Sequence, residues 1–230
     1  VMPSHYWGNY NLIFGLRKGA KFEKYPLFDG ESFNAEGLKS AIERCGEKAI
    51  ISFNSPNNPT GYSYTESDVE KITEVVLNAA ENGKKIVAIC DDAYFGLFYE
   101  DGIFKESLFT KFADLHENIL GIRVFGPTKE DYVWGLRVGA LVFGIKNGDK
   151  ELYDALESKA AGLIRGTISN ASHLSQRILS DAYKSPEYGE SKRKNDEKLK
   201  ERYNTTKEVL KNKKFSEVFT PYPFNSGYFM

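Results

Sequence analysis

Four stretches of the chain are apolar without polar alternation and too short for helices. They cover residues 49–53, 86–90, 119–125 and 136–145. Continuous apolar runs of this length are typical of strands that are buried on both faces of a sheet. We therefore expect four strands in one core.

Apolar residues at helical spacing fill the segments before the first two of these strands. Residues 34–45 place their apolar side chains on one face, with Asn34 as a cap. Thr65 and Asp68 resemble a capping box that opens a second helix, which Gly83 closes. Helices between buried strands predict an α/β fold, a three-layer α/β/α sandwich around a mostly parallel sheet.

The chain after Gly148 is mainly helical. Helical spacing covers residues 149–163, 170–183 and 187–214. The stretch 191–214 carries ten basic and four acidic residues. We interpret it as a solvated helix face and keep contact with nucleic acid as the alternative.

Composition narrows the class of protein. Lys and Arg number 31 against 32 Asp and Glu, which gives no overall attraction to nucleic acid or to an anionic membrane. No apolar run reaches membrane-spanning length. Two cysteines, Cys45 and Cys90, fit a reducing compartment, so we expect a cytoplasmic protein. His5, His116 and His173 are scattered and indicate no metal site.

Polar residues that carry chemistry follow three of the predicted strands. The segments are SPNNPTG at 55–61, DDAYFGL at 91–97 and GPTKEDYVWGLRVG at 126–139. In an open α/β sheet, ligands bind at the carboxyl ends of the strands. We therefore expect an amide, a carboxylate with a tyrosine, and a lysine with an arginine to form one site.

These segments resemble the class I/II aminotransferases, which are pyridoxal-phosphate enzymes of fold type I. SPNNPTG is similar to the family's Asn-Pro-(Thr)-Gly segment, and DDAYFGL is similar to its Asp-x-Ala-Tyr segment. The lysine at 129 and the arginine at 137 have the family's spacing, and WGNY at 7–10 resembles its aromatic-x-Asn-Tyr/His segment.

The resemblance assigns roles around a pyridoxal 5'-phosphate cofactor. Lys129 is the Schiff-base lysine, which then moves a proton during the reaction. Asp91 keeps the ring nitrogen protonated, and its neighbour Asp92 is a turn or supporting residue. Asn58 and Tyr94 donate to the ring's phenolic oxygen, and Asn58 also borders the substrate.

Three further residues complete the expected cofactor site. Trp7 stacks on the ring, with a core aromatic as the alternative. Arg137 pairs with the phosphate, with a surface ion pair as the alternative. The family often has a serine where this chain has Gly126, and Thr128 is the substitute as a phosphate ligand.

The segment IRGTISNASHLSQ, residues 164–176, resembles the Ile-Arg-x-x-x-Ser-Asn segment of aspartate aminotransferases. By that resemblance, Arg165 crosses to the partner's site in a homodimer and binds the side-chain carboxylate of aspartate or glutamate. The alternative is a helix cap or an intersubunit ion pair. The usual proline after Asn170 is missing.

The expected reaction moves an amino group between an amino acid and a 2-oxo acid. A lyase, decarboxylase or synthase of the same fold, or a regulator that binds the cofactor without turnover, stays open. The chain resembles a large domain from a longer enzyme, with residues 1–214 as the cofactor-binding domain and 215–230 as the beginning of a second domain.

Overall fold

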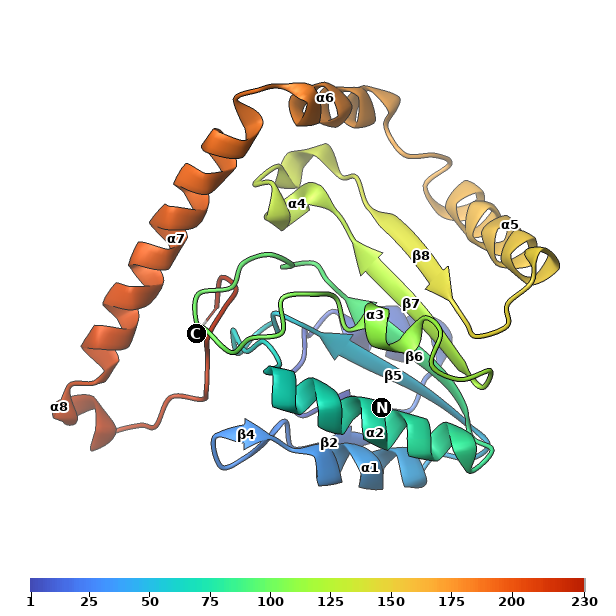
Figure 1. Cartoon of the computed structure of the whole chain (residues 1–230), viewed down its shortest axis with the longest axis horizontal. Coiled ribbons are helices and arrows are strands. Elements are labelled where there is room, and N and C mark those ends of the chain that lie inside the picture. Colours follow the sequence, from blue (N-terminus) through green and yellow to red (C-terminus); the bar gives the residue numbers. More distant parts are fainter. Residues whose placement is uncertain (230) are drawn as a thin grey trace.

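The computed structural model describes residues 1–229, and a four-stranded sheet forms its centre (Figure 1). The strand order is β5-β6-β7-β8, with β5, β6 and β7 parallel and β8 antiparallel to β7. These strands are Lys48–Asn54, Lys85–Asp91, Ile119–Phe125 and Ala140–Gly144. The predicted α/β fold with a mostly parallel sheet is confirmed.

Helices α1, α2 and α3 cover one face of this sheet. They span Ala35–Glu43, Glu66–Glu81 and Phe109–Phe112. Their apolar side chains form one core with alternate residues of β5 and β6, such as Ile51 and Ala88, both fully buried. The preceding residue of β5, Ile50, is 50% exposed. From Ile51 to Asn54 every residue of β5 is buried, so only the beginning of this strand departs from the burial that its apolar sequence predicts.

Capping residues define the ends of the first two helices as the sequence predicts. The Asn34 side chain accepts a hydrogen bond from the Gly37 amide at the start of α1. Thr65 and Asp68 form a complete capping box at the start of α2. Such boxes satisfy amides that have no partner within the helix.

Two predicted elements have different bounds in the structure, one at its beginning and one at its end. The strand predicted from residue 136 begins only at Ala140, because Trp134–Leu136 is a 3₁₀ turn, η2, and Arg137 has a left-handed backbone at φ 55°. The helix predicted over 187–214 ends as α7 at Leu210. There Asn212 caps the short helix α8, Lys213–Ser216. In both cases a local turn interrupts the apolar pattern.

The remaining elements lie around the sheet. Figure 1 shows α5, α6 and α7 following one another as an outer arc beyond β8. They span Lys150–Thr167, His173–Lys184 and Tyr188–Leu210. Short elements precede and interrupt the main sheet: β1 Met2–Pro3, η1 Asn11–Leu16, β2 Lys24–Tyr25, β3 Phe28–Asp29, β4 Ser32–Phe33 and α4 Pro127–Glu130.

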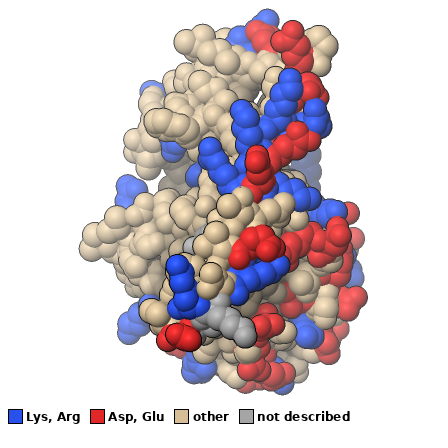
Figure 2. Space-filling view, turned by 90° about the vertical axis from the view of Figure 1, so that its left-hand side faces the viewer, with Lys and Arg blue, Asp and Glu red and all other residues tan. Residues whose placement is uncertain are grey.

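Helix α7 has one packed face and one charged face. Tyr203 is buried, and Leu199 and Leu210 pack beside it. On the outer face, Arg193 pairs with Glu190 and Glu197. Figure 2 shows basic and acidic side chains interspersed over this side of the molecule. Such pairing favours the interpretation of 191–214 as a solvated face. Within residues 1–229, no helix combines the length and apolarity that crossing a membrane requires.

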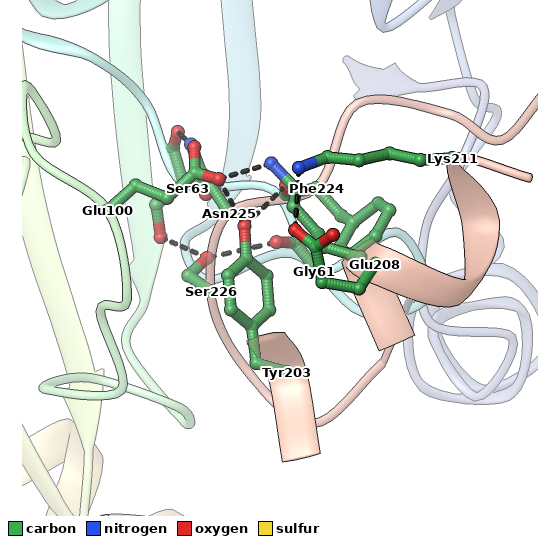
Figure 3. A network of polar contacts seen from close by, with 10 residues as sticks. Gly61, Ser63, Glu100, Tyr203, Glu208, Lys211, Phe224, Asn225 and Ser226 are labelled. Atoms are coloured by element: carbon green, nitrogen blue, oxygen red, sulfur yellow. Dashed lines mark hydrogen bonds and ion pairs between the residues drawn. The ribbon is translucent and has the colours of Figure 1, made fainter. Parts of the chain in front are cut away.

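The C-terminal segment 224–227 is hydrogen-bonded between two loops at the carboxyl ends of β5 and β6 (Figure 3). Asn225 accepts from the Ser63 amide at 2.7 Å and donates to the Ser63 carbonyl at 3.0 Å. Gly227 N–H donates to the Leu97 carbonyl at 2.8 Å. The Ser226 amide donates to the Gly61 carbonyl at 2.9 Å. The segment thus joins the loop after β5 to the loop after β6.

Replacing Gly61 with alanine is expected to destabilise this junction by about 2 kcal/mol or more. Gly61 has φ +70°, and a Cβ there would lie 1.8 Å from the Phe229 carbonyl oxygen. Urea unfolding of the variant measures the loss. Gly189→Ala in α7 is the control, because apart from its chain neighbours and the nearby backbone of α7 no described atom lies within 4 Å of its Cβ position. Equal unfolding free energies for Gly61→Ala and the unmodified chain would contradict the prediction.

Candidate active site

Asp91 is the last residue of β6 and has two hydrogen-bond donors. Tyr10 Oη donates to its Oδ2, and the Ala93 amide donates to its Oδ1 at 3.1 Å. Burial raises the pKa of this carboxyl, while the two donors and the nearby Lys129 ammonium act to lower it. A carboxylate that is held at the edge of the core in this way can stabilise a cationic group beside it.

The neighbouring Asp92 has different partners. It is buried, and it accepts from Arg123 Nε at 2.6 Å. The Arg123 guanidinium lies over the rings of Phe95 and Phe125, at 4.8 and 4.4 Å from their centroids. The charge of Asp92 is therefore compensated by Arg123, whereas Asp91 accepts from neutral donors, the Tyr10 hydroxyl and the Ala93 amide. This difference supports Asp91 as the functional carboxylate.

Asn54 joins the loop after β5 to the end of β6. Its Nδ2 donates to the Asp91 carbonyl at 2.9 Å, and its Oδ1 accepts from the Asn58 amide at 2.7 Å. In turn, Asn58 Nδ2 donates to Tyr94 Oη at 3.2 Å. The turn-rich segment thus places the Asn58 amide against the Tyr94 hydroxyl. Peptide bonds 55–56 and 58–59 in it are cis.

Lys129 lies in the short helix α4, directly after β7. Its Nζ is 5.0 Å from the centroid of the Tyr94 ring. Its carbonyl oxygen accepts from Tyr228 Oη at 3.0 Å, which ties the lysine to the C-terminal segment. Three parallel strands therefore bring Asp91, Asn58, Tyr94 and Lys129 to one edge of the sheet.

Tyr10 is a part of this cluster to which the sequence analysis assigned no role. Tyr10 belongs to the WGNY segment, in which the family resemblance assigns a role to Trp7 alone. The Trp7 ring packs edge-on against Tyr10, with ring centroids 5.6 Å apart, and is 39% exposed. Trp7 therefore touches the tyrosine that donates to Asp91. The expected stacking of Trp7 on a cofactor ring stays a prediction.

The other predicted residues have local partners. The exposed Arg137 donates to the Trp134 carbonyl at 2.9 Å, and Arg165 in the last turn of α5 donates to Ser169 Oγ at 2.6 Å. Thr128 is half-buried beside Lys129. Among the hydrogen bonds of residues 1–229, none joins Arg137 or Arg165 to the Asp91 cluster. Their phosphate and substrate roles stay predictions.

Comparison with known proteins decides the family. The model of the family "Aminotransferase class I and II" matches residues 1–230. The chain belongs to this family.

The relatives of this aminotransferase chain are distant but cover most of it. A probable aspartate/prephenate aminotransferase of Rickettsia felis is 26% identical over 96% of the chain. An aspartate aminotransferase of Bacillus sp. strain YM-2 is 28% identical over 81% of it. The alignments cover 49% and 43% of these relatives, so the chain spans about half the length of the curated aminotransferases it matches.

Solved structures agree with the family. The crystal structure of an aminotransferase from Anaerococcus prevotii has a TM-score of 0.81 and 28% identity, covering 98% of this chain and 56% of its own. An aromatic-amino-acid aminotransferase of Burkholderia pseudomallei, covalently bound to pyridoxal phosphate, has a TM-score of 0.69 at 22% identity, over 91% of this chain and 50% of its own. The fold of the large domain is shared in both.

Pyridoxal phosphate is the cofactor of this family, and the donor set in this chain fits it. An aldehyde requires an amine, which Lys129 supplies. A protonated ring nitrogen requires a carboxylate, and Asp91 is half-buried with both oxygens already oriented by donors. The phenolic oxygen requires donors, and Asn58 and Tyr94 lie together at 3.2 Å. The residues that satisfy these three requirements lie together at one edge of the sheet.

Proposed function

We propose that the protein containing this chain transfers an amino group between an amino acid and a 2-oxo acid, with pyridoxal phosphate as the cofactor. The observation that carries the proposal is the joint placement of Asp91, Asn58, Tyr94 and Lys129 at the ends of β5, β6 and β7. The domain division at 214/215 belongs to the same proposal, with residues 1–214 as the cofactor-binding part.

Bound pyridoxal phosphate supplies an electron sink that weakens the bonds at the α carbon of an amino acid. Lys129 Nζ would hold the cofactor, and the same amine could take up and release the proton of the substrate's α carbon. The Asp91 carboxylate would favour a protonated ring nitrogen beside it. Tyr10 and the Ala93 amide keep that carboxylate oriented.

The donors on the other side of the ring are Asn58 Nδ2 and Tyr94 Oη. Burial raises the pKa of Tyr94, while the hydrogen bond from Asn58 lowers it. Tyr94 therefore keeps its proton at neutral pH and is available to donate. Arg137 and Thr128 are proposed for the phosphate, and Trp7 for the ring face.

The proposed substrate is a dicarboxylic amino acid. Two of the relatives are named for aspartate, and Arg165 matches the residue position that the aspartate aminotransferase resemblance assigns to the side-chain carboxylate. Its position in the last turn of the exposed helix α5 is compatible with reaching a second subunit. We propose a homodimer with composite sites, in the cytoplasm.

The test uses the full-length protein with a panel of amino acids and 2-oxo acids. The proposal requires stoichiometric formation of a new amino acid and a new 2-oxo acid. Release of ammonia or carbon dioxide would instead indicate a lyase or a decarboxylase. Cofactor binding without any product would indicate a regulator.

Arg165→Leu in the full-length protein is expected to lower activity on aspartate and glutamate at least about tenfold more than activity on alanine and phenylalanine. A buried carboxylate that loses its guanidinium partner is left unpaired, whereas an apolar side chain loses nothing. Values of kcat/KM for the four substrates measure this. Arg177→Leu, which removes an exposed ion pair with Asp181 in α6, is the control. Equal losses on all four substrates would assign Arg165 a structural role.

A further inference from the structure

A second polar cluster lies just beyond Lys129, centred on Asp131. Tyr183 Oη donates to Asp131 Oδ2 at 2.7 Å, and Tyr188 Oη donates to Oδ1 at 2.5 Å. Lys192 Nζ donates to the same Oδ1 at 3.2 Å and lies 3.5 Å from Glu130 Oε1. The Asp131 side chain is only 7% exposed. One carboxylate thus accepts hydrogen bonds from three side chains of α6 and α7.

The three donors come from a different part of the fold than the carboxylate. They follow Asp131 by 52, 57 and 61 residues. The two tyrosine rings also pack edge-on, 5.2 Å apart, so each restricts the other. Burial raises the pKa of Tyr183 and Tyr188, and the Asp131 carboxylate that accepts their hydrogen bonds raises it further. Both phenols therefore stay protonated and remain donors at neutral pH.

Asp131 is bound to the lysine segment through the backbone. Its amide donates to the Pro127 carbonyl at 2.9 Å, which closes α4 around Lys129. The next residue, Tyr132, donates its amide to the Lys129 carbonyl at 3.3 Å and its hydroxyl to Asp196 of α7 at 2.5 Å. The segment around Lys129 is therefore attached to α7 on its C-terminal side.

Helix α7 also reaches the loop that follows Tyr94. Tyr203, one turn beyond Leu199, and Lys207, one turn further, both donate to Glu100. The positions 188, 192, 196, 203 and 207 recur at helical spacing on one face of α7. A single helix therefore connects the segment that carries Lys129 with the loop after Tyr94, and it sets their separation.

We propose that Asp131 is a positioning residue for Lys129, acting through its hydrogen bonds to Tyr183, Tyr188 and Lys192. This inference rests on the proposed function, because it takes Lys129 as the amine that holds the cofactor. Helix α4 is only four residues long and has no side-chain cap, so it gives little stability of its own. The Asp131 cluster supplies the long-range contacts that orient it.

The test compares the full-length protein with its Asp131→Asn variant and with the control Asp181→Asn. Asp181 is an exposed α6 residue that pairs with Arg177 at 2.9 Å. Amide hydrogen exchange of residues 127–136 is measured without cofactor. We expect exchange to be about tenfold faster or more in Asp131→Asn and unchanged in Asp181→Asn.

A second measurement follows the chemistry of Lys129. Each chain is mixed with pyridoxal phosphate and reduced with borohydride, and the labelled fraction at Lys129 is read by mass spectrometry. We expect this fraction to fall several-fold in Asp131→Asn. Noncovalent binding of pyridoxal phosphate is then compared between Lys129→Ala and Lys129→Ala/Asp131→Asn. It should be equal, because Asp131 acts through the lysine.

The outcomes separate this inference from the proposed function. Absence of labelling at Lys129 in the unmodified chain would overturn the proposed function, and this inference with it. Labelling there, with unchanged exchange and labelling in Asp131→Asn, would overturn only the inference. If Asp131→Asn lowers noncovalent binding in the Lys129→Ala background as much as it lowers labelling at Lys129, Asp131 merely maintains the fold. If Asp131→Asn does not fold, Tyr188→Phe removes one donor and carries the same comparison.

Discussion

Lys129→Ala is expected to remove the visible absorbance band that the chain acquires when pyridoxal phosphate is added. The band requires a covalent bond between an amine and the cofactor aldehyde. Lys129 Nζ lies 5.0 Å from the Tyr94 ring centroid, beside the carboxylate and amide that would hold the ring. After borohydride reduction, mass spectrometry should locate the cofactor at Lys129.

Lys105→Ala is the control for this experiment. Lys105 is exposed in the loop between β6 and α3, and it lies outside the Asp91 cluster. It should therefore keep the full band. The assignment fails if the cofactor is found on another lysine, or if Lys129→Ala keeps the band. Either result would also weaken the proposed transfer reaction, because no other lysine in the cluster could replace Lys129.

Asp91→Asn is expected to lower kcat of the full-length protein at least about a hundredfold. The amide has the shape of the carboxylate and can still accept from Tyr10. It lacks the negative charge that favours a protonated ring nitrogen, so the electron sink is weaker in the transition state. Steady-state kinetics with an amino donor and a 2-oxo acid measure the loss. Asp92→Asn tests the neighbouring carboxylate, and a larger loss of kcat there would reverse the assignment.

A stability measurement separates loss of charge from loss of fold. The folded pKa of Asp91 is raised, chiefly by burial. The folded state therefore binds this proton more strongly than the unfolded state. The stability gained from that proton is present at acid pH and is lost as the pH rises through the folded pKa. At neutral pH the ionised carboxylate destabilises the folded state, because burial disfavours its charge. The urea concentration at which Asp91→Asn unfolds should therefore be no lower than that of the unmodified chain.

The sequence predicted the central sheet well because buried parallel strands are continuous apolar runs. Continuous apolar runs located β5, β6 and β7 to within one residue at each end. Capping residues located the beginnings of α1 and α2. These signals are local, since a cap or a buried strand depends on a few neighbouring residues. β8 was extended too far because Arg137 adopts a left-handed backbone that no local pattern indicates.

The candidate site was predicted in part for a similar reason. Asp91, Asn58, Tyr94 and Lys129 follow strands, and parallel strands align their carboxyl ends, so the sequence order already implies proximity. The contributions of Tyr10 and Asp131 depend on contacts between residues 81 and 52–61 positions apart. Such contacts depend on the way the segments pack, which hydrophobic periodicity does not describe.

The segment 224–227 has a consequence for the order in which the protein is made. Ser63 and Asn225 are 162 residues apart, yet they exchange two hydrogen bonds beside the Asn58 segment. Ribosomes synthesise the chain from its N-terminus at roughly 5–20 residues per second. The strands that carry Asn58 and Asp91 therefore emerge long before the residues that join their loops. Pairing across this separation is slow as well as late, so the nascent chain contains the strands of the binding edge before it contains the segment that joins their loops.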